Sequence, residues 1–171
     1  CYIYKYDMAA DAFSETGYAY EFTPDIAGDT TQWKGAGYGL DLQTSGSSAS
    51  LIAVFGRYTN EGWEYNFGES AIVKIPLTGT GTAEMDLAGN NVTGVVVNGD
   101  YAYVTSVGGA QQANGNPASK VEVFDISGAS PSFLAEIDVS AIPSASGFAG
   151  GDFVDVAFVN NKAYVLAAHY N

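Results

Sequence analysis

Residues 56–70, GRYTNEGWEYNFGES, contain most of the side chains in this sequence that could recognise a ligand. They include Arg57, Tyr58, Trp63, Glu64 and Tyr65. Aromatic platforms beside one guanidinium and one carboxylate are typical of sugar or peptide recognition. A structural role is the alternative, in which Trp63 and Phe67 fold this segment down onto a neighbouring part of the protein.

Residues 23–37, TPDIAGDTTQWKGAG, form a second segment of this kind. They bring Trp33 and Lys34 close to Asp25 and Asp29. Trp33 and Trp63 together indicate carbohydrate binding as one hypothesis for the function.

Catalytic and metal-binding residues are sparse. His169 is the only histidine, so it lacks the further ligands that zinc needs and an evident partner for a nucleophilic triad. Asp41 and Asp155 occupy similar places in two apolar segments, where they could hold Ca²⁺ or act in acid–base chemistry. Alternatively, they bind the backbone of a neighbouring unit. We therefore predict no catalytic residue, no cofactor beyond a weak case for Ca²⁺, and no metal site beyond these two acids.

The charge of the chain excludes several partners. There are 19 acidic residues against 6 basic ones, and the net charge is −13. Such a chain repels phosphate backbones and anionic lipid headgroups, so we expect no nucleic-acid partner and no direct membrane insertion. An acidic, soluble surface is consistent with an extracellular, cell-surface or periplasmic location.

Cys1 is the single cysteine, so no disulfide can form within the chain. Two interpretations of its position stay open. Cys1 is either a fragment boundary or the lipidated first residue of a mature bacterial lipoprotein. The sequence CYIYKYDM enters a strand pattern at once, which favours the boundary.

Internal similarity organises the rest of the sequence. Three segments match one another: Ile3–Met8 (IYKYDM), Ile72–Leu77 (IVKIPL) and Val121–Ile126 (VEVFDI). Each alternates apolar and polar residues and precedes a turn and a second alternating segment. A further strand pair, VTGVVVNGDYAYVTSV, lies between the second and third of them, VDVAFVNNKAYVLAA follows the third, and GLDLQTSGSSASLIAVFG, between the first and second, is a looser copy. Asn98-Gly99 predicts a type I′ hairpin turn in VTGVVVNGDYAYVTSV, and Asn160-Asn161 marks the turn in VDVAFVNNKAYVLAA.

We therefore expect an all-β chain of twelve strands, with units of four strands labelled a to d. The order is c-d, a-b-c-d, a-b-c-d, a-b, with copies about 50 to 70 residues apart, as in β-propeller blades. The expected units are a half blade at 1–22, blades at 36–87 and 92–140, and a half blade at 152–171. A β-sandwich would alternate similarly but would not recur in this order.

The segment YAYVTS followed by KVEVFDIS resembles the bacterial propeller repeats called YVTN and LVIVD repeats. The resemblance covers residues 92–140 well and the other copies in part. It implies a surface-layer, periplasmic or scaffold protein, and relatives include lactonases. It specifies a blade and no activity.

The leading hypothesis is a non-enzymatic binding or scaffold propeller with a protein or carbohydrate ligand on its loop face. We expect residues 56–70 to form a b–c loop and residues 23–37 a d–a loop. In a propeller these connections share one face, which would gather their candidate residues with His169. The alternatives are a hydrolase, such as a lactonase or glycan-active enzyme, and a carbohydrate-binding propeller. A hydrolase requires Asp41, Asp155, Arg57 and His169 to converge. Since about three blades cannot close a ring, we also expect either further blades of a longer chain or a second copy.

Overall fold

The computed structural model describes residues 1–25, 27–45, 49–62, 64–77, 83–108, 119–137, 152–160 and 162–168. Within these residues the regular structure is entirely β, which confirms the expected class. None of them forms a helix with the length and hydropathy that a membrane span needs. The strands are β1 (Tyr2–Asp7), β2 (Ala12–Glu21), β3 (Lys34–Gln43), β4 (Ser50–Glu61), β5 (Glu64–Pro76), β6 (Glu84–Asn90), β7 (Val92–Asn98), β8 (Tyr101–Ser106), β9 (Lys120–Asp125), β10 (Ser132–Glu136), β11 (Asp152–Val159) and β12 (Lys162–Ala168).

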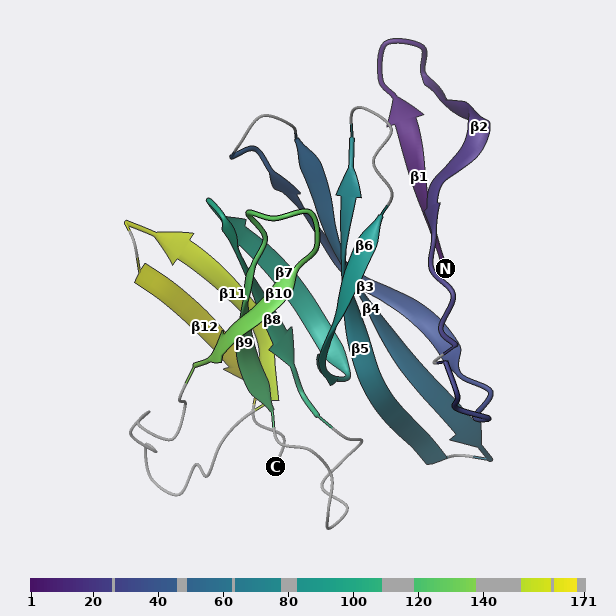
Figure 1. The fold of residues 1–171 in the computed structure, drawn as a ribbon, viewed down its shortest axis with the longest axis vertical. Helices are drawn as coiled ribbons and strands as arrows, with labels where there is room; N and C mark the ends of the chain where they lie inside the picture. The colour runs from purple at the N-terminus through teal and green to yellow at the C-terminus, as the bar shows by residue number, and fades with distance from the viewer. Residues whose placement is uncertain are drawn as a thin grey trace.

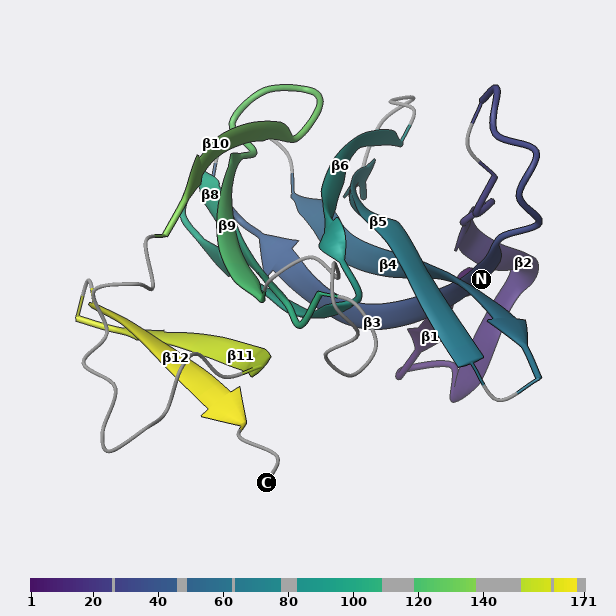
Figure 2. The same cartoon turned by 90° about the horizontal axis from the view of Figure 1, so that it is seen from below.

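These strands form four antiparallel sheets, each made of strands that are consecutive in the chain (Figure 1). Sheet A contains β1 and β2, sheet B β3 to β6, sheet C β7 to β10, and sheet D β11 and β12. In sheets B and C every strand pairs with its neighbours in sequence. The described strands are thus grouped as two, four, four and two, the grouping expected from the sequence. Figure 2 shows the sheets following one another in chain order, with A at one end and D at the other.

The central strands of sheet B, β4 and β5, are buried on both faces in their middle, where successive side chains point to opposite sides and each side is covered by a neighbouring sheet. On β4, Ala53 and Phe55 pack in a cluster with Phe22 and Ile3 of the sheet A side. Ile52 and Val54 pack in a second cluster against sheet C. That second cluster also contains Ile72, Ala88, Val92, Ala102, Val104, Phe124 and Ile126.

Aromatic contacts join the outer sheets to the inner ones. Phe22 stacks on Phe55 between sheets A and B, with ring centroids 4.6 Å apart. Tyr103 of sheet C packs on Phe158 of sheet D at 4.3 Å. The hydroxyl of Thr93 also donates a hydrogen bond of 2.9 Å to the Phe153 carbonyl. Each sheet is therefore held by its neighbours in the series.

Lys74 links sheets B and C at one end of their shared core. Its ammonium group donates hydrogen bonds to the carbonyl oxygens of Ile126 at 2.6 Å and Gly128 at 2.8 Å. The Gln43 amide donates a third bond, of 3.0 Å, to the same Ile126 oxygen. Burial lowers the pKa of Lys74, while the nearby acids oppose this shift.

One predicted turn was displaced. Asn98 pairs with Tyr101 and so ends β7, and the two turn residues are Gly99 and Asp100. Of the two, only Gly99 has a positive φ, of 62°. A single positive φ at the first turn position is the pattern of a type II′ turn, so the type I′ prediction was wrong. In sheet D, Asn160 does follow β11 as expected, with a φ of 49°.

The prediction of a connecting loop over residues 56–70 was also wrong. Most of this segment continues β4 and β5 as a two-stranded ribbon, with Tyr58 opposite Phe67 and Asn60 opposite Tyr65. Its alternation of aromatic and polar residues on both sides of Gly62 is a strand pattern. β4 ends at Glu61, and β5 begins at Glu64.

Candidate functional site

The β4–β5 ribbon carries three aromatic rings on one face, here called the aromatic ladder: Tyr58, Tyr65 and Phe67. Tyr58 lies directly opposite Phe67, and Tyr65 lies two residues along the strand from Phe67, so all three share a side of the ribbon. The ring centroids of Tyr58 and Tyr65 are 6.0 Å apart, and those of Tyr65 and Phe67 are 6.4 Å apart with an angle of 18° between planes. Tyr65 is 50 % exposed, so its ring is available to a ligand.

Two polar side chains border the ladder. Lys34 of β3 lies opposite Tyr58, and Asn60 lies opposite Tyr65, so both are on the ladder face. The Lys34 ammonium group donates a hydrogen bond to the Asn60 side-chain oxygen. One exposed ring and two partly buried rings beside an amine and an amide can give both apolar contact and directed hydrogen bonds.

Arg57 lies on the opposite face of the ribbon and is only 1 % exposed. Its guanidinium group donates hydrogen bonds of 2.7 Å to the carbonyl oxygens of Pro24 and Glu69. It also lies over the Phe22 ring, 5.3 Å from the centroid. Burial lowers the pKa of Arg57 from its usual range. The structure therefore places this predicted ligand-binding residue inside the protein, because Arg57 follows Phe55 by two residues on β4 and so points to the same, core side.

Trp33 is also on that opposite face, half-buried. Its indole N–H donates a hydrogen bond of 2.7 Å to Asp29, and this bond is the main reason that the pKa of Asp29 is lowered. The ring covers Gly68, where a Cβ atom would lie 2.7 Å from it. Trp33 and the ladder thus occupy opposite faces of the ribbon and do not form one platform.

Three other predicted residues lie wholly or partly outside the described part of the chain. Trp63 and His169 are outside the described residues, and Glu64 is described only as the first backbone position of β5. Their roles as ligand-binding candidates stay predictions.

Asp41 and Asp155 bind the backbone. Asp41 accepts hydrogen bonds from the Val97 N–H of sheet C at 2.7 Å and from the Leu42 N–H at 2.8 Å. Asp155 accepts one from the Val156 N–H at 2.8 Å. Within the described ranges, no group of three or more Asp, Glu, His or Cys side chains is arranged to hold a metal ion.

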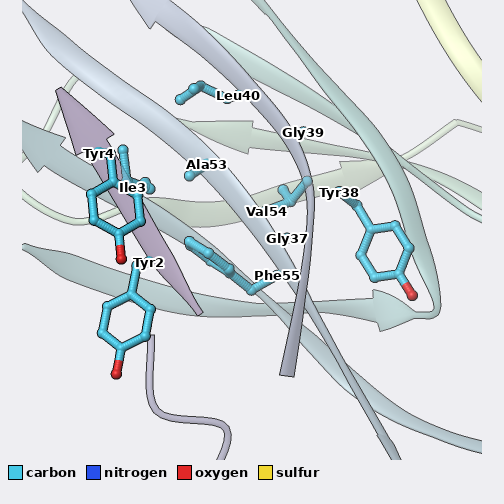
Figure 3. Close-up of a pocket in the computed structure, with 10 residues that line it drawn as sticks. All are labelled: Tyr2, Ile3, Tyr4, Gly37, Tyr38, Gly39, Leu40, Ala53, Val54 and Phe55. Atoms are coloured by element: carbon cyan, nitrogen blue, oxygen red, sulfur yellow. The ribbon is translucent and has the colours of Figure 1, made fainter. Parts of the chain in front are cut away.

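A pocket of about 340 Å³ lies between sheet A and the first strands of sheet B (Figure 3). Tyr2, Ile3 and Tyr4 of β1 form one side, and residues 37–40 of β3 form another. Ala53, Val54 and Phe55 of β4 complete the lining, so most of the pocket wall is apolar.

The arrangement of the ladder was only half apparent in the sequence. Tyr58 and Tyr65 were predicted as ligand-binding residues, whereas Asn60 was missed and Phe67 was considered only as a structural residue. The signal was present, since Tyr58 and Asn60 precede Gly62, and Tyr65 and Phe67 follow it, with the two-residue period of a strand.

Comparison of the chain with protein-family models, with curated proteins and with solved structures found no match. The geometry of the described residues is therefore the basis for the functional proposal.

Proposed function

We propose that the four sheets are successive blades of a β-propeller similar to the YVTN and LVIVD repeat proteins. Support comes from two complete four-stranded meanders that pack face to face through one apolar core. In this proposal sheet A is the outer half of one blade and sheet D the inner half of another. The acidic net charge of −13 fits an extracellular, cell-surface or periplasmic setting.

We further propose that the protein binds a ligand without chemical conversion, and that the ligand is a neutral carbohydrate. The carrying observation is the aromatic ladder, in which half-exposed Tyr65 follows Tyr58 and Phe67 along one face of the ribbon. The apolar face of a sugar ring packs on such aromatic surfaces, while Lys34 and Asn60 hydrogen-bond its hydroxyls. A polyanionic glycan is disfavoured because the chain is itself strongly acidic.

A hydrolase is the less favoured alternative. It required Arg57, Asp41, Asp155 and His169 to meet in one site. Arg57 instead donates hydrogen bonds to the Pro24 and Glu69 carbonyl oxygens, and Asp41 accepts one from the Val97 N–H in sheet C. These two side chains leave β3 and β4 on opposite faces of sheet B, which argues against a shared catalytic role.

The ladder is tested by measuring binding to a glycan array and then by calorimetry with the strongest neutral glycan. We expect Tyr65→Ala to weaken binding at least about tenfold, because stacking on an exposed ring contributes on the order of 1 to 2 kcal/mol. The matched control is Tyr101→Ala, which removes a tyrosine of similar exposure, 44 % against 50 %, from sheet C. Equal binding by wild type and Tyr65→Ala would exclude the ladder as the site.

A further inference from the structure

In the described part of the chain, sheets A and D have only two strands each, so β1 and β12 are edge strands with a single partner. β1 pairs only with β2, and β12 pairs only with β11, whereas sheets B and C are complete meanders of four strands. An open edge presents unpaired N–H and C=O groups to any strand that fits beside it. In the proposed propeller the next strand of sheet A would lie beside β1, and the next strand of sheet D would lie beside β12.

The space beside β1 is apolar and already shaped. The pocket in Figure 3 lies there, lined by Ile3 of β1 and by Ala53 and Phe55 of β4. Leu40 of β3 also lines it and is 54 % exposed, and Leu42, on the same face of β3, is 45 % exposed. Large apolar side chains are thus uncovered where a strand pair next to β1 would lie.

The β11–β12 hairpin has a matching uncovered face. Tyr164 and Leu166 of β12 are 57 % and 60 % exposed, and Val159 of β11 is 54 % exposed. They lie on the side that faces away from sheet C, because Val156 and Phe158 occupy the other side, toward sheet C.

Sheets B and C indicate how such a hairpin would pair with β1. In both sheets the first residue of the second strand lies opposite one residue of the third strand: Ser50 opposite Pro76, and Tyr101 opposite Asp125. Lys162 begins β12 after a two-residue turn, as Tyr101 begins β8. The matching segments Ile3–Met8, Ile72–Leu77 and Val121–Ile126 make Asp7 the counterpart of Pro76 and Asp125.

This register is complementary in charge and in shape. It sets Lys162 opposite Asp7, so that a positive and a negative side chain would face each other across the new strand pair. Four residues further along, it sets Leu166 opposite Ile3, whose side chain lines the pocket. Tyr164 and Leu166 then face sheet B, as Ile3 does.

We propose that the β11–β12 hairpin of a second copy pairs with β1 and fills this pocket, completing sheet A as a four-stranded sheet. Each copy has one β11–β12 hairpin and one open β1 edge. Two copies can therefore form the contact twice, which gives a closed dimer. The number of copies rests on the proposed propeller, in which each chain supplies about half of a ring of roughly six blades. The strand pairing itself rests only on the edges, the pocket and the register.

The experiment is sedimentation equilibrium of the 171-residue chain over a range of concentrations. We expect a dimer, of twice the 17.8 kDa chain mass. Leu166→Glu should raise the dissociation constant on the order of a thousandfold, since it removes a buried leucine from both contacts. The matched control, Leu77→Glu, changes a leucine of comparable exposure, 49 %, directly after β5 and should leave the dimer intact.

A second pair of variants tests the register without altering the apolar surface. Lys162→Glu places two acids opposite each other and should weaken the dimer about tenfold. The double variant Lys162→Glu/Asp7→Lys reverses both charges and should restore it. A chain that stays monomeric at all concentrations, or a double variant no tighter than Lys162→Glu, would overturn the proposal.

Glycan binding separates this proposal from the proposed function. The aromatic ladder lies on sheet B, so the monomeric Leu166→Glu variant should still bind the glycan. A wild-type monomer that binds glycan contradicts only the second copy, and a dimer that binds no glycan contradicts only the carbohydrate site.

Discussion

Two ionisable side chains, Arg57 and Glu122, are buried, and they differ in how far hydrogen bonds and nearby charges compensate for their burial. Arg57 is charged in the core and satisfied by two carbonyl oxygens and an aromatic ring. Glu122 of β9 is 6 % exposed, and its Oε2 accepts a 2.6 Å hydrogen bond from the Gly89 N–H. The Lys120 ammonium is 3.9 Å from its other oxygen and also 3.2 Å from Glu136. Burial dominates and raises the pKa of Glu122, despite that hydrogen bond and that lysine.

This shift predicts a pH-dependent stability. A carboxyl whose pKa is raised on folding stabilises the protein fully below its ordinary value of 4.5, and this contribution is lost as pH rises through the folded pKa. Glu122→Gln keeps the acceptor for Gly89 and removes the charge. We expect its free energy of unfolding to exceed that of wild type near neutral pH, and the difference to shrink toward pH 4.5. Urea unfolding across this range measures it.

The control is Asp25→Asn, which neutralises an exposed acid and should follow the wild-type pH dependence. A Glu122→Gln variant that is less stable than wild type near neutral pH would show that the Glu122 carboxylate stabilises the fold.

At the level of strands, the spacing of sheets B and C depends on one glycine. A Cβ atom on Gly39 of β3 would lie 3.0 Å from the Val95 nitrogen and 3.2 Å from the Gly94 Cα of β7. Both are backbone atoms, which cannot turn aside as the end of a side chain can. Asp41, two residues further along β3, accepts a hydrogen bond from the Val97 N–H of β7. β3 therefore rests directly on the β7 backbone.

We predict that Gly39→Ala destabilises the protein by about 2 kcal/mol, because one added methyl must move two sheets apart. Gly37→Ala is the matched control on the same strand. Its Cβ would meet only the Phe55 ring, at 3.7 Å, an ordinary contact, so we expect a change within about 0.5 kcal/mol. Thermal or urea unfolding of both variants measures the difference. Equal effects would show that the close approach is not what makes Gly39 necessary.

The sequence was most informative about strands and least informative about where side chains point. The alternation in KVEVFD and the repeat of short strand pairs predicted β9, the meanders and the grouping of strands. Alternation along β4 puts Arg57 on the same face as Phe55, but its burial was not predictable, because it depends on contacts with Phe22, Pro24 and Glu69 that the alternation does not show. The pocket was not predictable for a related reason, since it is formed by β1, β3 and β4 together.

At the level of the whole molecule, charge opposes compactness. The chain has a net charge of −13, with 19 acids and 6 bases. Of these few cations, Arg57 and Lys74 bind mainly backbone oxygens in the interior. Many acids at the surface therefore face other acids across water.

We predict that added salt stabilises the fold. Raising NaCl from about 10 mM to about 300 mM shortens the screening length from about 30 Å to below 8 Å, which weakens repulsion between surface acids. The urea midpoint should rise, by an amount on the order of 1 kcal/mol in the free energy of unfolding. KCl at equal ionic strength is the control and should give the same shift. A falling midpoint would mean that attractive pairs outweigh the repulsion.

The burial of β4 on both faces also bears on how this sequence can change over time. Along β4, residues 52–55 are all at most 3 % exposed, so none of these positions can accept a polar side chain without cost. The exposed faces of β1 and β12 carry no such restriction within a single copy. Substitutions should therefore be tolerated less at these four positions of β4 than at the exposed positions of β1 and β12 that take no part in the proposed contact between copies.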